Sequence, residues 1–268
     1  MRLTIRHDTH YRYDHPVRFS AQYLRLTPYS NPAQRVVRWA INAPGRLKSW
    51  SDGYGNVCST LVCDQLTDDI VISAMGIIDT SDTQGVVPPD ESGMPIEVFL
   101  RSTSLTEIDD VIRDFAEPYR DRADSDRIAV LHELMAALNK AIEYQKGETN
   151  IHSTASEVLL DGKGVCQDHA HAFIACARAI AIPARYVSGY LYTGENEEAS
   201  VASHGWAAAW VDDLGWVNFD VANLVCATER YVGLAQALDY AGASPVRGVR
   251  QGGSLAEKMD VQERVRQG

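Results

Sequence analysis

Hydrophobic and polar residues alternate at the start of the chain. In residues 2–13 the odd positions begin with Leu3 and Ile5 and end with two tyrosines, while the even positions are mostly charged. A period of two places successive side chains on opposite faces of a β-strand. Similar runs begin near residues 19 and 37, and an apolar run covers 70–78. Turn-forming residues separate these runs, so we expect an antiparallel, sandwich-like β domain over residues 1–80.

The pattern changes after residue 80. Residues 81–95 contain adjacent prolines and no periodicity, which indicates a linker that we extend to residues 81–100. Apolar residues then recur at helical spacing in 105–115 and in 128–142. Ser125 or Asp124 is a candidate N-cap for the second of these helices.

A cysteine stands where a glycine loop gives way to a third helical pattern. The segment 162–171 reads GKGVCQDHAH, and Ala170, Phe173, Ile174 and Ala177 continue it as one apolar helix face. This spacing predicts that Cys166 lies in the first helical turn, where free N–H groups and the helix dipole favour a thiolate. A buried, inert thiol is the alternative. Just upstream, Thr154 and Glu157 form a possible capping box for a short helix.

Strand patterns return after Pro183. The segments 184–192, 204–213 and 215–221 are rich in β-branched and aromatic residues, and the last two are separated by the tight segment DDLG. They are therefore expected to pair as a hairpin. We predict an α+β protein in which residues 101–268 form a core, with a central helix that carries the cysteine packed on an antiparallel sheet.

Composition limits the range of functions. The chain has 268 residues, 45% of them hydrophobic, and a formal net charge of −11. A negative field repels phosphate, so we expect neither nucleic acid nor a membrane surface as a partner. The first residues lack the apolar stretch of a signal peptide, and the five cysteines show no small-scaffold pattern. These features predict a cytoplasmic protein with reduced thiols.

Two further residues complete a candidate acyl-transfer site. A cysteine nucleophile needs a base to accept and return its proton, and a group that orients the base. His204 begins one strand of the predicted hairpin and Asp220 ends the other, so the two can lie on one face. Taken singly, such a histidine is more often a surface residue and such an aspartate a turn residue. Their joint occurrence after Cys166 favours a catalytic triad.

The motifs around these three residues resemble a known family. The segments GVCQDHAHAFIACARAIAIPARYVSGYLY and SHGWAAAWVDDLGWVNFDVAN are similar to the bacterial transglutaminase-like superfamily, and the N-terminal β region is similar to the domain that precedes its core. The resemblance implies a papain-like core in which Cys166 is the nucleophile, His204 the base and Asp220 the orienting residue. The family often has Ala after the histidine and Pro after the aspartate, where this chain has Gly205 and Val221.

Other parts of a site are less well defined by sequence. The backbone N–H of Cys166 is one expected oxyanion donor, and Tyr144 or Gln145 is a candidate for the other. Zinc binding by Cys166, His169 and His171 is a competing interpretation, but on a helix the side chain of residue 171 turns away from the face of 166 and 169. The acidic loop 194–199 lacks the ligand spacing of a calcium loop. We expect no metal and no cofactor.

The expected reaction is hydrolysis of a peptide or other amide bond through a thioester. Cross-linking of the transglutaminase type and a non-catalytic peptide-binding module on the same fold are the alternatives. Specificity is expected in the loops 146–153 and 193–203. Glu195, Glu197 and Glu198 of the second loop predict a preference for neutral or basic groups nearby in the peptide or protein substrate. The sequence does not predict the oligomeric state.

Overall fold

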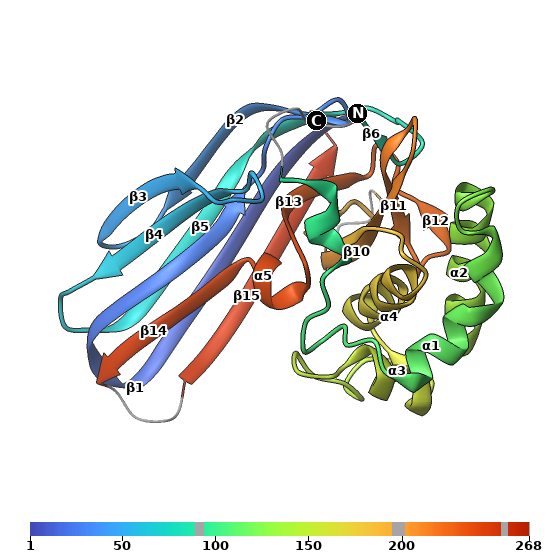
Figure 1. Cartoon of the computed structure of the whole chain (residues 1–268). Helices are drawn as coiled ribbons and strands as arrows, with labels where there is room; N and C mark the ends of the chain where they lie inside the picture. Colours follow the sequence, from blue (N-terminus) through green and yellow to red (C-terminus); the bar gives the residue numbers. More distant parts are fainter. Residues whose placement is uncertain (89–93, 195–201, 253–256, 268) are drawn as a thin grey trace.

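The structure is a computed structural model that describes residues 1–88, 94–194, 202–252 and 257–267. Two large antiparallel sheets, a short parallel pair of strands and a group of helices make up this part of the chain (Figure 1). One sheet contains the N-terminal strands, and the other carries the helices on one of its faces. In these ranges no helix has both the length and the apolar character needed to cross a membrane.

The N-terminal sheet is organised around one long strand. Its members are β1 (Arg2–Thr27), β2 (Gln34–Asn42), β3 (Arg46–Ser51), β4 (Val57–Cys63), β5 (Thr67–Thr80), β14 (Val246–Gly252) and β15 (Glu257–Gln267). The first half of β1 lies between β5 and β15, and its second half lies between β4 and β14. Two separate packed sheets were expected here. Instead, β1 is long enough to hydrogen-bond four partners and joins all of these strands into one sheet.

The last two strands of the chain return to the first sheet. Val249 of β14 pairs with Ala21, and Val265 of β15 pairs with Ile5. In Figure 1 these red strands lie beside the blue β1, and both chain ends lie at the same edge of the molecule. The sequence grouped these strands with the core of residues 101–268, whereas in the structure they complete the N-terminal sheet.

The second sheet is curled and carries the helices. It contains β6 (Val86–Val87), β9 (Ala184–Leu191), β10 (Ala202–Val211), β11 (Gly215–Asp220), β12 (Val225–Cys226) and β13 (Tyr231–Ala237). The predicted hairpin is confirmed, since β10 and β11 pair antiparallel with Val211 opposite Gly215. The segment expected to be a linker contributes β6, which pairs with β11.

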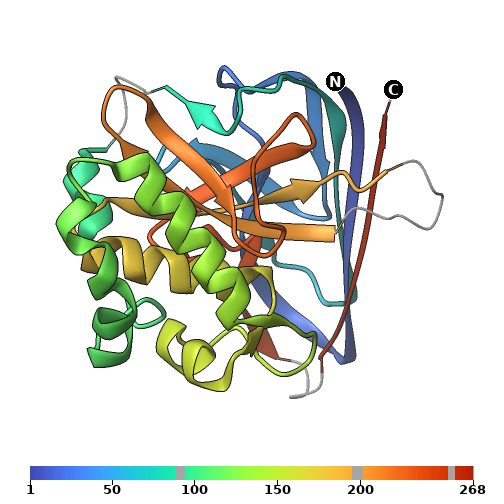
Figure 2. The same cartoon turned by 90° about the vertical axis from the view of Figure 1, so that its right-hand side faces the viewer.

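The helices surround a central one. They are α1 (Asp110–Ala116), α2 (Arg127–Ala141), α3 (Ala155–Asp161), α4 (Cys166–Ala179) and α5 (Tyr240–Ala243), with 3-10 turns η1 (Ile96–Leu100) and η2 (Glu117–Arg122). Helix α4 lies between the sheet and helices α1, α2 and α3 (Figure 2), while α5 packs on β9 and β13. The capping box of α3 is confirmed at Thr154 and Glu157. The expected cap of α2 was wrong, because Asp126 occupies the N-cap and makes no side-chain bond there.

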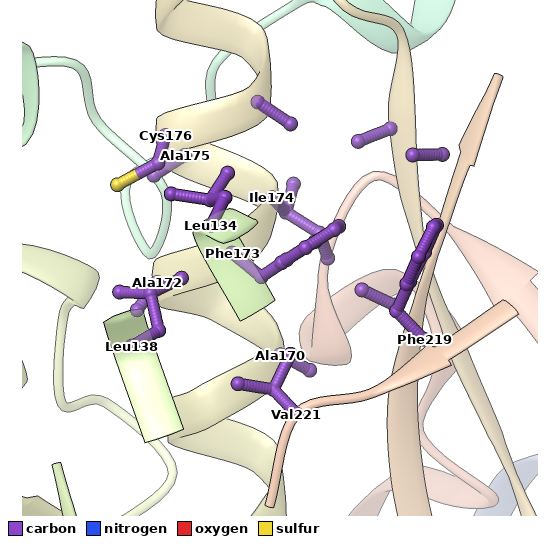
Figure 3. Packing of buried hydrophobic residues seen from close by; sticks show 14 of the residues in the cluster. Leu134, Leu138, Ala170, Ala172, Phe173, Ile174, Ala175, Cys176, Phe219 and Val221 are labelled. Atoms are coloured by element: carbon purple, nitrogen blue, oxygen red, sulfur yellow. The ribbon is translucent and has the colours of Figure 1, made fainter. Parts of the chain in front are cut away.

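Helix α4 is buried on all sides rather than on one face. Phe173 of α4 packs on Phe219 of β11 with ring centroids 5.1 Å apart. Leu134 and Leu138 of α2 contribute to the same core from another side (Figure 3). Small residues in α4, including Ala170 and neighbouring alanines, allow this close approach. Packing on every side therefore fixes the position of the residue at which α4 begins, Cys166.

Candidate active site

Cys166 is the first residue of α4, as predicted, and its side chain is half-buried. The short strands β7 (Glu143–Tyr144) and β8 (Lys163–Gly164) pair in parallel just before it. Asp168 fixes the turn: one carboxylate oxygen, Oδ2, accepts hydrogen bonds from the Val165 N–H at 2.8 Å and from the Thr149 hydroxyl at 2.6 Å. A Cβ on Gly164 would lie 2.7 Å from the Asp168 Cβ, so glycine is required there.

His204 and Asp220 meet on neighbouring strands. Nε2 of His204 donates to Oδ2 of Asp220 over 2.6 Å, and His204 also forms a hydrogen bond with Cys166. Since Nε2 is engaged by the carboxylate, Nδ1 is the ring nitrogen left to face the thiol. The structure therefore brings Cys166, His204 and Asp220 together, although α4 and the two strands are distant in sequence.

The environment of His204 favours its charged form. Burial acts to lower the pKa of His204, but hydrogen bonds to Asp220 and Cys166 outweigh it and raise the pKa to about 10. Burial also acts to raise the pKa of Asp220, but the bond from His204 and further donors hold that pKa below its usual value. An imidazolium is therefore stable here at neutral pH.

Two residues that the sequence analysis did not identify hold Asp220. The Tyr231 hydroxyl donates to Oδ2 at 2.7 Å, and the Asn223 side-chain amide donates to the same oxygen at 2.6 Å. Trp206 stacks on the His204 ring with centroids 6.2 Å apart. Trp206 follows His204 by two positions on the same strand face, which is a local signal. Tyr231 comes from β13, and nothing near it in sequence indicates its role.

Tyr186 explains why Gly205 follows the histidine. A Cβ at position 205 would lie 1.9 Å from the Tyr186 hydroxyl oxygen. The Tyr186 ring is buried, and burial, with the nearby Cys166, raises its pKa well above the usual value. The tyrosine hydroxyl thus occupies the space that an alanine methyl group would need.

The two oxyanion candidates differ in their surroundings. Tyr144 is half-exposed, and its pKa is raised by burial and then by the nearby charges of Cys166 and Asp220. The Gln145 side chain instead donates to Oε1 of Glu148 at 3.1 Å. Cys166 thus contributes to the electrostatic environment of Tyr144, whereas the Gln145 side chain is engaged by Glu148.

The two histidines considered as metal ligands are bonded to backbone groups. His169 places Nδ1 and Nε2 2.9 and 3.0 Å from the carbonyl oxygens of Val165 and Ile142. His171 Nε2 accepts the Tyr240 N–H at 3.1 Å. In the described ranges, no three Cys, His, Asp or Glu side chains converge as a metal site would require. Glu195, Glu197 and Glu198, and most of the loop 194–199, lie outside the described residues.

Comparisons with known proteins place two parts of the chain in described families. Residues 113–221 match the transglutaminase-like superfamily, and residues 3–79 match the bacterial transglutaminase-like N-terminal region. An uncharacterized protein of Mycobacterium bovis is 31% identical over 97% of this chain and 91% of its own length. An uncharacterized protein of Mycobacterium leprae is 29% identical over 94% of each chain.

A solved structure shares the overall fold. It is a protein of Cytophaga hutchinsonii described provisionally as a cysteine protease, with a TM-score of 0.75 and 21% identity. The match covers 98% of this chain and 90% of that one. The arrangement of the two sheets and the helices is therefore shared along nearly the whole length of both proteins.

Proposed function

Since this chain belongs to the transglutaminase-like superfamily, we propose that it is a thiol hydrolase of peptide or other amide bonds with a papain-like Cys166–His204–Asp220 triad. The observation that carries the proposal is the arrangement of three side chains. A cysteine begins a buried helix, and a histidine bonded to it is held at 2.6 Å by a buried aspartate. Nucleophile, base and orienting group are the parts that acyl transfer by a thiol needs.

The proposed reaction has two steps. The Cys166 sulfur attacks the amide carbonyl, the C–N bond breaks, and His204 gives its proton to the leaving amine. Water then attacks the thioester, His204 takes a proton from that water, and the carboxylic acid leaves as the thiolate re-forms. Asp220 stays ionised and holds the ring through Nε2.

Stabilisation of the oxyanion is assigned to groups beside the nucleophile. The Cys166 N–H lies at the N-terminus of α4, where backbone donors are free of helical partners. We propose the Tyr144 hydroxyl as the second donor, because its electrostatic environment includes Cys166. The Gln145 side chain would have to leave Glu148 to serve instead.

Transamidation is the second candidate function. The same thioester would then be attacked by an amine in place of water. Its support is the superfamily itself. Water is always available as an acceptor, whereas no described group marks a site for an amine, so hydrolysis is the proposed reaction.

A peptide and amide library tests the proposal. Wild-type protein should cleave a subset of the library, and Cys166→Ala should reduce turnover by at least a thousandfold while the folded state is retained. Cys226→Ala is the matched control, because burial raises the pKa of that half-buried thiol and it takes no part in the site. Adding a primary amine separates the two reactions, since transamidation forms a new amide product. Absence of turnover for every amide would favour a binding module.

The same library tests the expected substrate preference. A variant with Glu195, Glu197 and Glu198 all changed to Gln should accept acidic peptides better than wild type, by a few-fold, because exposed charges are screened. Identical profiles would remove this loop from the specificity determinants. Substitutions in 146–153 would then be the next variants to profile.

A further inference from the structure

A cavity of about 440 Å³ lies on the far side of the second sheet from α4. Ala207 and Ala209 of β10 pack toward α4, while Trp206 and its neighbours on the opposite face line the cavity. Three tryptophans and three tyrosines dominate its described wall, and residues 29–34 of the N-terminal sheet region close another side. This volume falls in the range of small-molecule binding sites.

One cation lies in the wall of this cavity. Arg185 is 8% exposed, and its guanidinium carbon lies 3.9 Å from the centre of the Trp216 ring. Burial lowers the pKa of Arg185 to about 10, with Tyr29 acting in the opposite direction, so the side chain is charged at neutral pH. In the described part of the chain no acidic side chain contributes to its electrostatic environment, and its Nε donates to no protein group.

A second buried arginine, Arg178, has a structural role and can be compared with Arg185. Arg178 donates from Nε, Nη1 and Nη2 to the carbonyl oxygens of Phe99, Ala184 and Leu238 and to the Thr106 hydroxyl. A buried cation whose Nε has no partner is costly, and stacking on Trp216 and Phe99 offsets only part of that cost. Arg185 is therefore poorly explained as a purely structural residue.

Several other polar groups of the cavity wall are hydrogen-bonded within the protein. The Gln34 amide donates to the Gly233 carbonyl at 2.9 Å, and the Asn218 amide donates to the Gly85 carbonyl at 2.9 Å. Gln236 accepts from the Tyr29 hydroxyl at 3.2 Å. No Asp or Glu is among the described residues of the wall. Arg185 is thus a positive charge with no negative charge beside it in the described wall.

We propose that this cavity binds a carboxylate carried on an aromatic or apolar body, with the carboxylate at Arg185 and the body against Trp206, Trp210 and Trp216. A guanidinium matches a carboxylate in geometry. One buried positive charge balances one negative charge, whereas a phosphate monoester would bring more charge than the wall can neutralise. The carboxylate belongs either to a free organic acid or to the C-terminus of a peptide.

The site adjoins the proposed triad without including it. Trp206 stacks on His204, and Tyr231 donates to Asp220, while both also line the cavity. The ligand would thus lie behind the histidine–aspartate pair and press on the residues that position it. Binding of the ligand can be measured without any substrate, so this proposal is tested separately from the proposed hydrolysis.

Calorimetry with matched probes tests the inference. Indole-3-acetate should bind wild-type protein, and its uncharged analogue indole-3-acetamide should bind at least tenfold more weakly. Arg185→Gln should weaken acid binding roughly ten- to a hundredfold. Ala33→Trp, which fills the cavity and keeps the arginine, should abolish it. Arg38→Gln, the same charge change on an exposed arginine, should leave affinity unchanged.

The outcomes separate the possibilities. Tighter binding of the peptide Ala-Ala-Trp than of indole-3-acetate would identify a peptide C-terminus as the source of the carboxylate. Tighter binding of indole-3-acetate would identify a free organic acid. Equal affinity for acid and amide, unchanged affinity in Ala33→Trp, or no binding by any probe would overturn the proposal. If Arg185→Gln fails to fold, the proposal is still tested by comparing the affinities of indole-3-acetate and indole-3-acetamide and by the Ala33→Trp variant.

Discussion

At the scale of single residues, the charge of His204 depends on its two partners. The pKa of His204 is raised to about 10 by hydrogen bonds to Asp220 and Cys166 that outweigh burial. Asp220→Asn removes the carboxylate, so we predict that the pKa of His204 falls and the imidazolium is lost at lower pH. NMR titration of the His204 ring measures this directly. An unchanged titration in the variant would contradict the assigned pairing.

The same pKa shifts set the pH dependence of stability. The pKa of His204 is higher in the folded chain than the ordinary 6.5, so its contribution is complete below about pH 6.5 and is lost as pH rises through about 10. The folded pKa of Asp220 lies below the ordinary 3.8, so its contribution is present above 3.8 and is lost as pH falls through the folded value.

Gly205 provides a second test at residue scale. Gly205→Ala places a methyl group where the Tyr186 hydroxyl lies, 1.9 Å from the new Cβ. We predict a loss of about 1–3 kcal/mol in the free energy of unfolding. Gly205→Ala combined with Tyr186→Phe should recover part of this loss, because the hydroxyl oxygen at 1.9 Å is gone while the ring carbon Cζ remains 2.6 Å from the new Cβ. Urea unfolding of the two single variants and the double variant measures the coupling. Additive losses would show that the hydroxyl oxygen is not the obstacle.

At the scale of elements, helix caps separate a correct prediction from a wrong one. Thr154 accepts the Glu157 N–H and forms the capping box of α3, whereas Ser125 lies outside the cap of α2. Thr154→Ala should therefore lower the free energy of unfolding by about 0.5–2 kcal/mol. Ser125→Ala should be close to neutral. Chemical denaturation compares the two, and similar costs would refute the assigned caps.

Elements with strong local signals were predictable. The strand pattern of residues 2–13, the helix that begins at Cys166 and the hairpin before Asp220 each follow from periodicity or a turn. The full length of β1 was not predictable from the sequence. Bulges at Arg12/Val17 and Leu24/Thr27 interrupt the alternation of buried and exposed side chains in its second half. The three triad candidates came from local motifs. Tyr231 was missed because its contact with Asp220 exists only after β13 joins the sheet.

At the scale of the whole molecule, the two ends of the chain share one sheet. No local pattern predicts this, because pairing between β1 and β15 joins residues more than 240 positions apart, such as Ile5 and Val265. Val265 is 6% exposed in the core of this sheet, while Val261 on the same strand is 45% exposed. Burial of the C-terminal strand is thus part of the stability of the N-terminal sheet.

A pair of substitutions tests this closure. Val265→Asp buries a charge against β1, so we predict a loss of more than about 3 kcal/mol in the free energy of unfolding. Val261→Asp places the same charge on a half-exposed site and should cost clearly less. Thermal and urea unfolding measure both. Equal losses would indicate that β15 is not packed as described.

The central claim is that Cys166 is an acyl-accepting nucleophile. The most direct measurement is mass spectrometry of the protein after brief reaction with p-nitrophenyl acetate, an activated ester that needs no specific recognition. We predict one acetyl group per chain on the Cys166 peptide, accompanied by a burst of nitrophenol. The adduct should vanish in Cys166→Ala and persist in Cys226→Ala. Equal acetylation of wild type and Cys166→Ala, on any other residue, would contradict it.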